Sequence, residues 1–132
     1  MNRVLRNATA AAGILFALTS VAQANETGQS LYNDNCAACH QRTGVGIKGA
    51  FPALTGGKLV SGPLPVLVAT VLNGRGGMPA FKSDLTDAQM ALVLSYIRAS
   101  WGNKASAVTT AQVMQARIKA SAVAKPKNLQ AH

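Results

Sequence analysis

Five consecutive residues decide the fold of this chain: Cys36-Ala37-Ala38-Cys39-His40. Because positions i, i+3 and i+4 fall on one face of a helical turn, the two thiols and the imidazole can address the same flat ligand. The C-x-x-C-H spacing is typical of covalent haem attachment, in which each thiol forms a thioether and the imidazole binds the iron. The two alanines leave little bulk between the backbone and a porphyrin. The stretch therefore predicts a site for one haem c.

Two other chemistries use a Cys-x-x-Cys pair, and both are disfavoured here. A structural zinc site needs four ligands, and outside these five residues the sequence offers no other Cys and only His132. A thioredoxin-like dithiol is expected beside a βαβ pattern, whereas this motif is followed by a glycine-rich loop. A dithiol oxidoreductase without haem is kept as the weaker alternative.

The first 24 residues have the pattern of a secretory signal peptide. Arg3 and Arg6 precede an apolar run over residues 8–18, and small residues then lead to a cleavage site after Ala24. The run is shorter than the roughly 20 apolar residues that a bilayer span needs, and no later segment is long enough. We therefore expect a periplasmic protein with no membrane span in its mature chain. An uncleaved N-terminal anchor is the alternative.

The rest of the sequence predicts an all-α domain. Length allows one domain, and few aromatic residues are present, so a large apolar cofactor would fill much of the core. Glycines and prolines punctuate residues 41–62, which we expect to form a loop. Four helices are expected. The first is a short helix over residues 27–39 with Leu31 and Tyr32 inside, and the second covers residues 64–72, with its inward face formed by Leu64, Leu67, Val68 and Val71. The third runs from the capping box at 86–89 to Trp101, and the fourth from the capping box at 109–112 through Ile118.

An iron bound by His40 has a second axial position, and Met78 is the predicted ligand there. Met78 lies in the loop of residues 74–81, where glycines allow a close backbone approach. Met90 and Met114 fall inside predicted helices, where a thioether ordinarily fills the core. Because His/Met ligation occupies both faces of the iron, we expect electron transfer and no enzymatic turnover.

Three motifs in sequence order resemble those of a class I cytochrome c. They are residues 36–40, the Phe-Pro-Ala-Leu stretch at 51–54, and the Gly-Met-Pro-Ala-Phe stretch at 77–81. The resemblance implies a cytochrome c fold of about four helices and long loops wrapped around one covalently bound haem. The domain is expected over residues 25–120, and a flexible tail over 121–132.

The resemblance also implies a role for each site residue. Cys36 and Cys39 would be the thioether anchors, with His40 the proximal and Met78 the distal iron ligand. In the family, a proline carbonyl near the histidine orients its ring, and Pro52 is the candidate for that role. The remaining candidates for contact with the haem are Phe51 and Leu54 in the proximal loop and, on the third helix, Tyr96 together with Trp101, which would pack against the first helix and the porphyrin edge.

Partners are indicated by a second resemblance and by charge. Residues 95–103, followed by Val108-Thr109, are similar to the haem domains in cytochrome subunits of bacterial membrane-associated alcohol and aldehyde dehydrogenases. This implies redox proteins as donor and acceptor, a dehydrogenase and a terminal oxidase of a respiratory chain. A haem-based sensor or ligand-binding protein with a labile Met78 is the alternative function.

The chain is strongly basic, with 13 Lys and Arg residues against 4 Asp and Glu and a formal net charge of +9. Export disfavours nucleic acid as a partner, so we expect an acidic protein partner and an encounter that salt weakens. An ordinary solvated surface with no special partner is the alternative. The basic residues of the predicted loop region are Arg42, Lys48, Lys58, Arg75 and Lys82.

Overall fold

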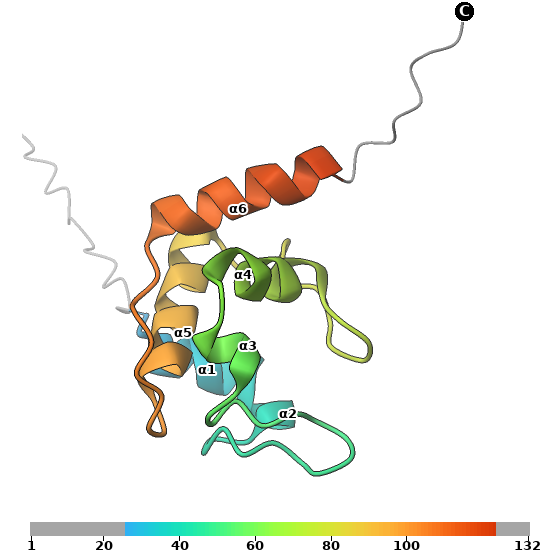
Figure 1. The fold of residues 1–132 in the computed structure, drawn as a ribbon, viewed down its shortest axis with the longest axis vertical. Helices are drawn as coiled ribbons and strands as arrows, with labels where there is room; N and C mark the ends of the chain where they lie inside the picture. The colour runs from blue at the N-terminus through green and yellow to red at the C-terminus, as the bar shows by residue number, and fades with distance from the viewer. Residues whose placement is uncertain (1–25, 124–132) are drawn as a thin grey trace, which may run out of the picture.

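A computed structural model of the chain describes residues 26–123, and the predicted signal peptide lies outside the described residues (Figure 1). Within this range the structure contains helices and two isolated β-bridges but no strand, so the all-α prediction is confirmed. The helices are α1 (Gly28–Asn35), α2 (Ala37–His40), α3 (Lys58–Ser61), α4 (Leu64–Asn73), α5 (Asp87–Ala99) and α6 (Thr110–Val123).

The first predicted helix, over residues 27–39, is divided into α1 and α2. Thr27 caps α1, since its hydroxyl accepts the Ser30 N–H at 3.1 Å. At Cys36 the backbone leaves the helical region, with φ −122° and ψ −34°, and a new helical turn starts there. The expectation of one continuous helix was therefore wrong. The break makes the haem motif a helical turn separate from α1.

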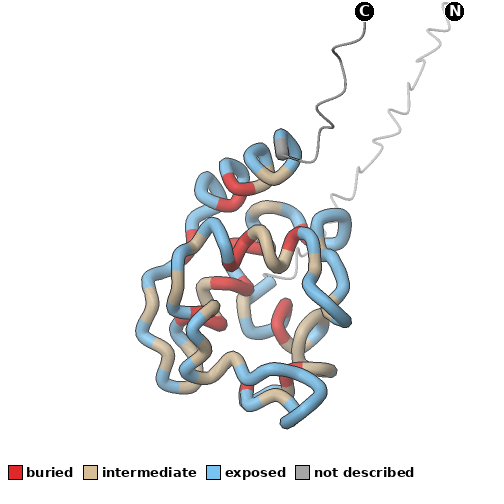
Figure 2. Tube along the Cα trace, turned by 45° about the vertical axis from the view of Figure 1, so that its right-hand side comes forward, coloured by how far each residue is buried: buried red, intermediate tan, exposed pale blue. Residues whose placement is uncertain are grey.

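The core lies between α1, α4, α5 and α6. Helix α5 packs against α1 and α6, and α6 also packs against α4, so that α6 lies across one end of the molecule while α2 lies at the other (Figure 1). A Cβ at Gly28 would collide with the Leu92 carbonyl, which shows how closely α1 approaches α5. Figure 2 shows that the buried positions lie mainly along the helices, whereas the loops are largely exposed.

The predicted inward-facing residues of the first and second helices are confirmed. Leu31 and Tyr32 are buried in α1, and Leu67 and Val68 are buried in α4. Leu64 and Val71, the other two residues predicted on that face of α4, are partly buried and packed against the core. The structure adds a short helix, α3, inside the segment that we predicted to be loop, and its Val60 is buried. Such a single turn carries too little periodicity to be recognised in a sequence.

The predicted capping box that opens the third helix is confirmed, but the helix ends earlier than expected. The Thr86 N–H donates to Gln89 Oε1 at 2.9 Å, and the Gln89 N–H donates to Thr86 Oγ1 at 3.2 Å. Helix α5 stops at Ala99 because Ser100 is extended, with φ −94° and ψ 161°. Trp101 is therefore not on the third helix, and its φ of 53° turns the chain sharply away.

The fourth helix, α6, is longer than expected and faces the core differently. The capping box of Thr109 and Gln112 is confirmed. The helix runs to Val123 and so enters the range expected to be a tail, and the rest of that range lies outside the described residues. Met114 is 48% exposed, so the expectation that it fills the core was wrong, whereas Met90 is fully buried as expected. Val113 and Ala116 occupy the inward face of α6 instead.

One charged side chain joins three parts of the core. Arg98 is only 5% exposed, and its Nη1 and Nε donate to the carbonyls of Val60 and Ser106, both at 2.7 Å. These bonds fasten α5 to α3 and to the segment that leads to α6. Across residues 26–123 no helix combines the length and apolar character needed to cross a bilayer.

Candidate functional site

The structure brings the two cysteines and the histidine of the motif together on one turn. The N–H groups of Cys39 and His40 both donate to the Cys36 carbonyl, at 3.2 and 3.0 Å. Both cysteines are free thiols and half-buried, whereas His40 is buried. Burial, and then the nearby Cys39, raises the pKa of the Cys36 thiol to about 11, so this thiol is protonated at neutral pH.

The orientation of His40 is set by Pro52. Nδ1 of His40 lies 2.9 Å from the Pro52 carbonyl oxygen. Because a carbonyl can only accept a hydrogen bond, Nδ1 carries the ring proton and Nε2 keeps its lone pair. The imidazole is thus held in the tautomer that binds iron through Nε2. The contact is the one for which Pro52 was singled out in the sequence.

The loop that carries Pro52 is fastened to the end of α5. Gly44, at φ +68°, lies against the indole of Trp101, and a Cβ there would come within 2.5 Å of the ring. Asn103 donates to the Leu54 carbonyl at 3.1 Å and accepts the Gly56 N–H at 2.9 Å. The backbone carbonyl of Leu54 is therefore held by the side chain of Asn103, and Leu54 itself is half-buried against the core. The packing of Gly44 on Trp101 and the hydrogen bonds of Asn103 hold this loop so that the Pro52 carbonyl stays beside His40.

Three aromatic rings from α1 and the end of α5 form a cluster behind the motif. The centroid of the Tyr32 ring lies 5.6 Å from that of Tyr96 and 5.0 Å from that of Trp101. Tyr96 and Trp101 thus pack against the first helix as expected, and contact of Tyr96 with a porphyrin stays a prediction. The Tyr32 hydroxyl donates to the Gln41 carbonyl at 2.5 Å. Desolvation by burial, with smaller contributions from Cys36 and Tyr96, raises the pKa of Tyr32 to about 12.

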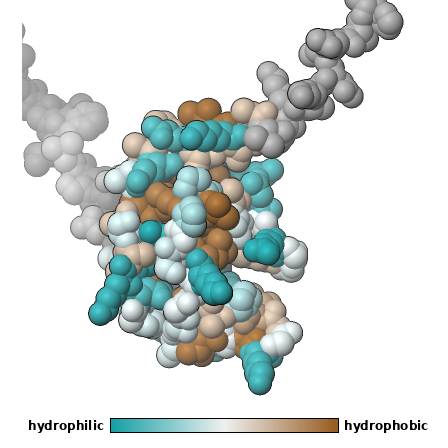
Figure 3. Space-filling view, viewed as in Figure 1, coloured by the Kyte–Doolittle hydropathy of each residue, from teal (hydrophilic) through white to brown (hydrophobic). Residues whose placement is uncertain are grey.

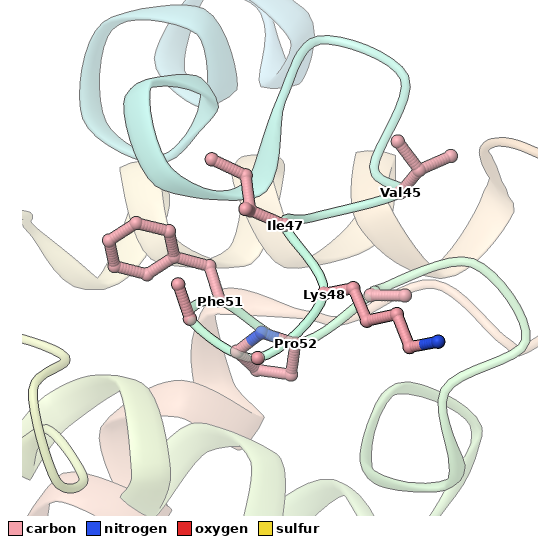
Figure 4. A pocket seen from close by; sticks show the side chains of 8 residues that line it. Val45, Ile47, Lys48, Phe51 and Pro52 are labelled. Carbon is pink, nitrogen blue, oxygen red and sulfur yellow. The ribbon is translucent and has the colours of Figure 1, made fainter.

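An apolar hollow opens beside this loop. Val45, Ile47 and Phe51 are 55%, 44% and 37% exposed, which is unusual for large apolar side chains. Ile47 and Phe51 exchange two backbone hydrogen bonds of 2.8 Å, so their side chains project to the same side, opposite to Lys48 (Figure 4). The hollow measures about 380 Å³ and is lined by Val45, Ile47, Lys48, Gly49, Ala50, Phe51, Pro52 and Ala53.

Met78 lies in a tight hairpin at the end of α4. The N–H of Arg75 donates to the Met78 carbonyl at 3.2 Å, and the N–H of Met78 donates to the Arg75 carbonyl at 3.0 Å. Gly76, at φ +58°, provides the turn, and Met78 is half-buried. Figure 3 shows the surface hollowed at its right-hand edge between this hairpin and the loop that follows α2. The Met78 hairpin therefore borders this recess of the surface, whereas the 380 Å³ hollow is lined by residues within 45–53 and by none of the hairpin.

The arrangement fits a covalently bound haem. The donor set of two thiols and one imidazole sits on a single turn, and the imidazole offers Nε2 toward a metal. Exposed apolar side chains stand beside that turn, where a porphyrin would cover them. Between residues 42 and 82 five basic side chains are exposed, namely Arg42, Lys48, Lys58, Arg75 and Lys82.

A family model described as cytochrome c oxidase, cbb3-type, subunit III matches residues 23–97, which is more than half of the chain. The chain belongs to the cytochrome c family. Cytochrome c6 of Leptolyngbya boryana is 40% identical over 72 residues, covering 53% of this chain and 85% of the relative. The resemblance to class I cytochrome c is thereby confirmed, and membership of this family implies covalent haem c and electron transfer.

Larger proteins contain the same domain. The cytochrome c subunit of the quinone alcohol dehydrogenase of Gluconobacter oxydans (strain 621H) is 34% identical over 100 residues, covering 67% of this chain and 21% of the relative. The CcoP subunit of the cbb3-type oxidase of Azospirillum brasilense is 40% identical over 90 residues, covering 63% of this chain and 30% of the relative. This cytochrome therefore spans less than a third of these two relatives. The predicted similarity to dehydrogenase cytochrome subunits is confirmed.

Several residues that shape the site escaped the sequence reasoning. Gly44 was noticed only as a loop glycine, and Asn103 only as part of a similar stretch. Each acts through a partner distant in the chain, Trp101 in one case and Leu54 in the other. A glycine or an asparagine has no local signal for such a contact. The carbonyl of Pro52 could be found only because the motif around it resembles the family's.

Proposed function

We propose that this cytochrome is a periplasmic carrier of single electrons with one haem c, attached through Cys36 and Cys39 and ligated by His40 and Met78. The observation that carries the proposal is the bond between His40 Nδ1 and the Pro52 carbonyl. With the ring proton on Nδ1, Nε2 holds the lone pair with which this buried imidazole can bind a metal. The two thiols lie on the same helical turn. The bound group would supply a reversible one-electron change of its iron.

Met78 supports electron transfer over turnover at the iron. Its hairpin faces the loop that follows α2 across the recess at the right-hand edge of Figure 3, and its thioether is a soft, neutral ligand that favours ferrous iron. With a side chain of this chain on each face of the iron, a small substrate would find no open position. His40 and Met78 would hold the same coordination in both oxidation states, so little reorganisation would accompany each electron.

The partners that we propose are a dehydrogenase as electron donor and an oxidase as acceptor. Relatives of this cytochrome are named as subunits of alcohol, gluconate and fructose dehydrogenases and of a cbb3-type oxidase. Lys48 lines the hollow, and the other basic side chains between residues 42 and 82 are exposed, so an acidic partner surface fits, with a small and short-lived interface. The signal-peptide pattern of residues 1–24 supports the periplasm as the place of this encounter.

The test is production of the full chain in a host with the haem-attachment machinery. We expect a red protein whose haem resists acid-acetone extraction, and a colourless product would contradict the proposal. Met78→Ala should abolish the near-infrared sulfur-to-iron band of the ferric protein. Met114→Ala is the matched control, because Met114 is exposed on α6 and its loss should leave the band intact.

A second measurement separates the carrier from a sensor. Carbon monoxide should bind the reduced wild-type protein slowly, since Met78 would first have to leave the iron, and should bind Met78→Ala rapidly. Equally rapid binding by both proteins would favour the sensor alternative. Salt titration of electron transfer to an acidic redox protein should show a rate that falls as ionic strength rises.

A further inference from the structure

Helix α6 lies outside residues 23–97, the part that the family model matches, yet it contacts the body of the domain closely. It crosses α4 and α5 at the end of the molecule where the Met78 hairpin is attached (Figure 1). In the part of the chain that the structure describes, the one ion pair joins α6 to α5, between Arg117 Nε and Asp87 Oδ1 at 2.7 Å.

The guanidinium of Arg117 has two further partners, and both are backbone carbonyls. Nη1 donates to the Lys82 carbonyl at 2.6 Å, and Nη2 donates to the Leu85 carbonyl at 3.1 Å. All three nitrogens of the fork are thus used on one short segment, residues 82–87. Such planar, multiple hydrogen bonding fixes position in a way that a lysine ammonium cannot match.

This segment is the direct continuation of the Met78 hairpin. Its start is attached to the last turn of α4, because the N–H groups of Phe81 and Lys82 donate to the carbonyls of Val71 and Leu72, at 3.0 and 3.2 Å. The peptide groups on both sides of Lys82 are therefore held, one by α4 and the other by Arg117. Three residues lie between Met78 and Lys82: Phe81 is bonded to α4, whereas Pro79 and Ala80 make no hydrogen bond to another element within residues 26–123.

The structure assigns to Arg117 the role of a positioning residue for Met78. By fixing the C-terminal end of the hairpin, Arg117 limits how often the hairpin swings away and takes the thioether from the iron. The inference rests on the proposed ligation by Met78. It gives α6 a role in the electron carrier beyond covering the core: the helix would favour the arrangement in which the Met78 thioether is held toward the bound group.

The experiment uses the full-length, haem-loaded protein and imidazole as a competing ligand. Imidazole binds ferric iron only when Met78 has left, so its dissociation constant measures how often the hairpin opens. We expect Arg117→Met to tighten imidazole binding roughly threefold to tenfold, the range for losing partly exposed charge-assisted bonds. Arg117→Lys should restore part of the difference. Asp87→Asn should change binding less than Arg117→Met, since both carbonyl bonds remain.

Two control variants distinguish positioning from general stability. Lys119→Met removes an exposed charge on the same helix and should bind imidazole like the wild type. Arg98→Met weakens the core at a place unconnected with residues 74–87, so it should lower the urea midpoint without tightening imidazole binding. Unchanged binding in Arg117→Met, or equal tightening in Arg98→Met, would overturn the assignment. If the wild type itself lacks the sulfur-to-iron band, the proposed ligation by Met78 is wrong and this inference is wrong with it. If the band is present but Arg117→Met does not change imidazole binding, only this inference is refuted.

Discussion

Replacement of Arg98 by methionine is expected to lower the free energy of unfolding by about 3 kcal/mol. The side chain is 5% exposed and donates two bonds of 2.7 Å, to the carbonyls of Val60 and Ser106. Bonds from a charged donor contribute about 1.5–3 kcal/mol each when buried. The bond to Val60 is buried and counts fully, whereas the bond to Ser106 is half-buried and its carbonyl regains water when Arg98 is removed, so it counts for about 1 kcal/mol.

The measurement is urea unfolding of the haem-loaded protein, followed by far-ultraviolet circular dichroism. The midpoint should fall while the slope stays constant, because the surface exposed on unfolding is nearly the same. Arg98→Lys should lose about half as much, since one ammonium reaches fewer carbonyls. Arg42→Met, on the exposed loop after α2, serves as control and should change stability by less than about 0.5 kcal/mol. An unchanged free energy of unfolding in Arg98→Met would refute the reasoning, because it would mean that the cost of desolvating the guanidinium cancels the gain from its hydrogen bonds.

Two further predictions concern the cluster behind the haem motif. Tyr32→Phe should cost about 1–2 kcal/mol by removing the bond to the Gln41 carbonyl. It should also remove an alkaline loss of stability: because burial raises the pKa of Tyr32 from 10.0 to about 12, its contribution is complete below pH 10 and falls as pH rises through 12, as melting temperatures will show. Gly44→Ala should lower the melting temperature much more than Gly49→Ala, since both have positive φ but only Gly44 abuts Trp101; equal effects would contradict this packing.

A large part of the site could be predicted from sequence because its signals are local. The spacing of Cys36, Cys39 and His40 states its chemistry within a single turn. The capping boxes at Thr86 and Thr109 are equally local, and the structure confirms both. Met78 stood out by its glycine-rich surroundings, and its role as an iron ligand stays a prediction that the Met78→Ala experiment will decide.

The predictions of helix bounds and inward faces were wrong where contacts with residues distant in the sequence override the local helical pattern. Helix α5 ends before Trp101, whose indole packs on Gly44, and the break at Cys36 makes the motif a helical turn separate from α1. Met114 was expected inside because it lies in a helix, but the helix turns Val113 and Ala116 toward the core. In each case periodicity identified the helix, and tertiary packing chose its end or its inward face.

The sequence by itself determined the kind of cofactor, the helical class and the family, because covalent attachment and helix capping depend on residues three or four positions apart. Only the tertiary structure decided what holds these parts in place. The Pro52 carbonyl selects the tautomer of His40. Arg98 joins α5 to α3, and Arg117 ties α6 to the segment that follows Met78. These bonds join backbone carbonyls, which every residue possesses, to side chains far along the chain. Their partners therefore cannot be identified until the chain is folded.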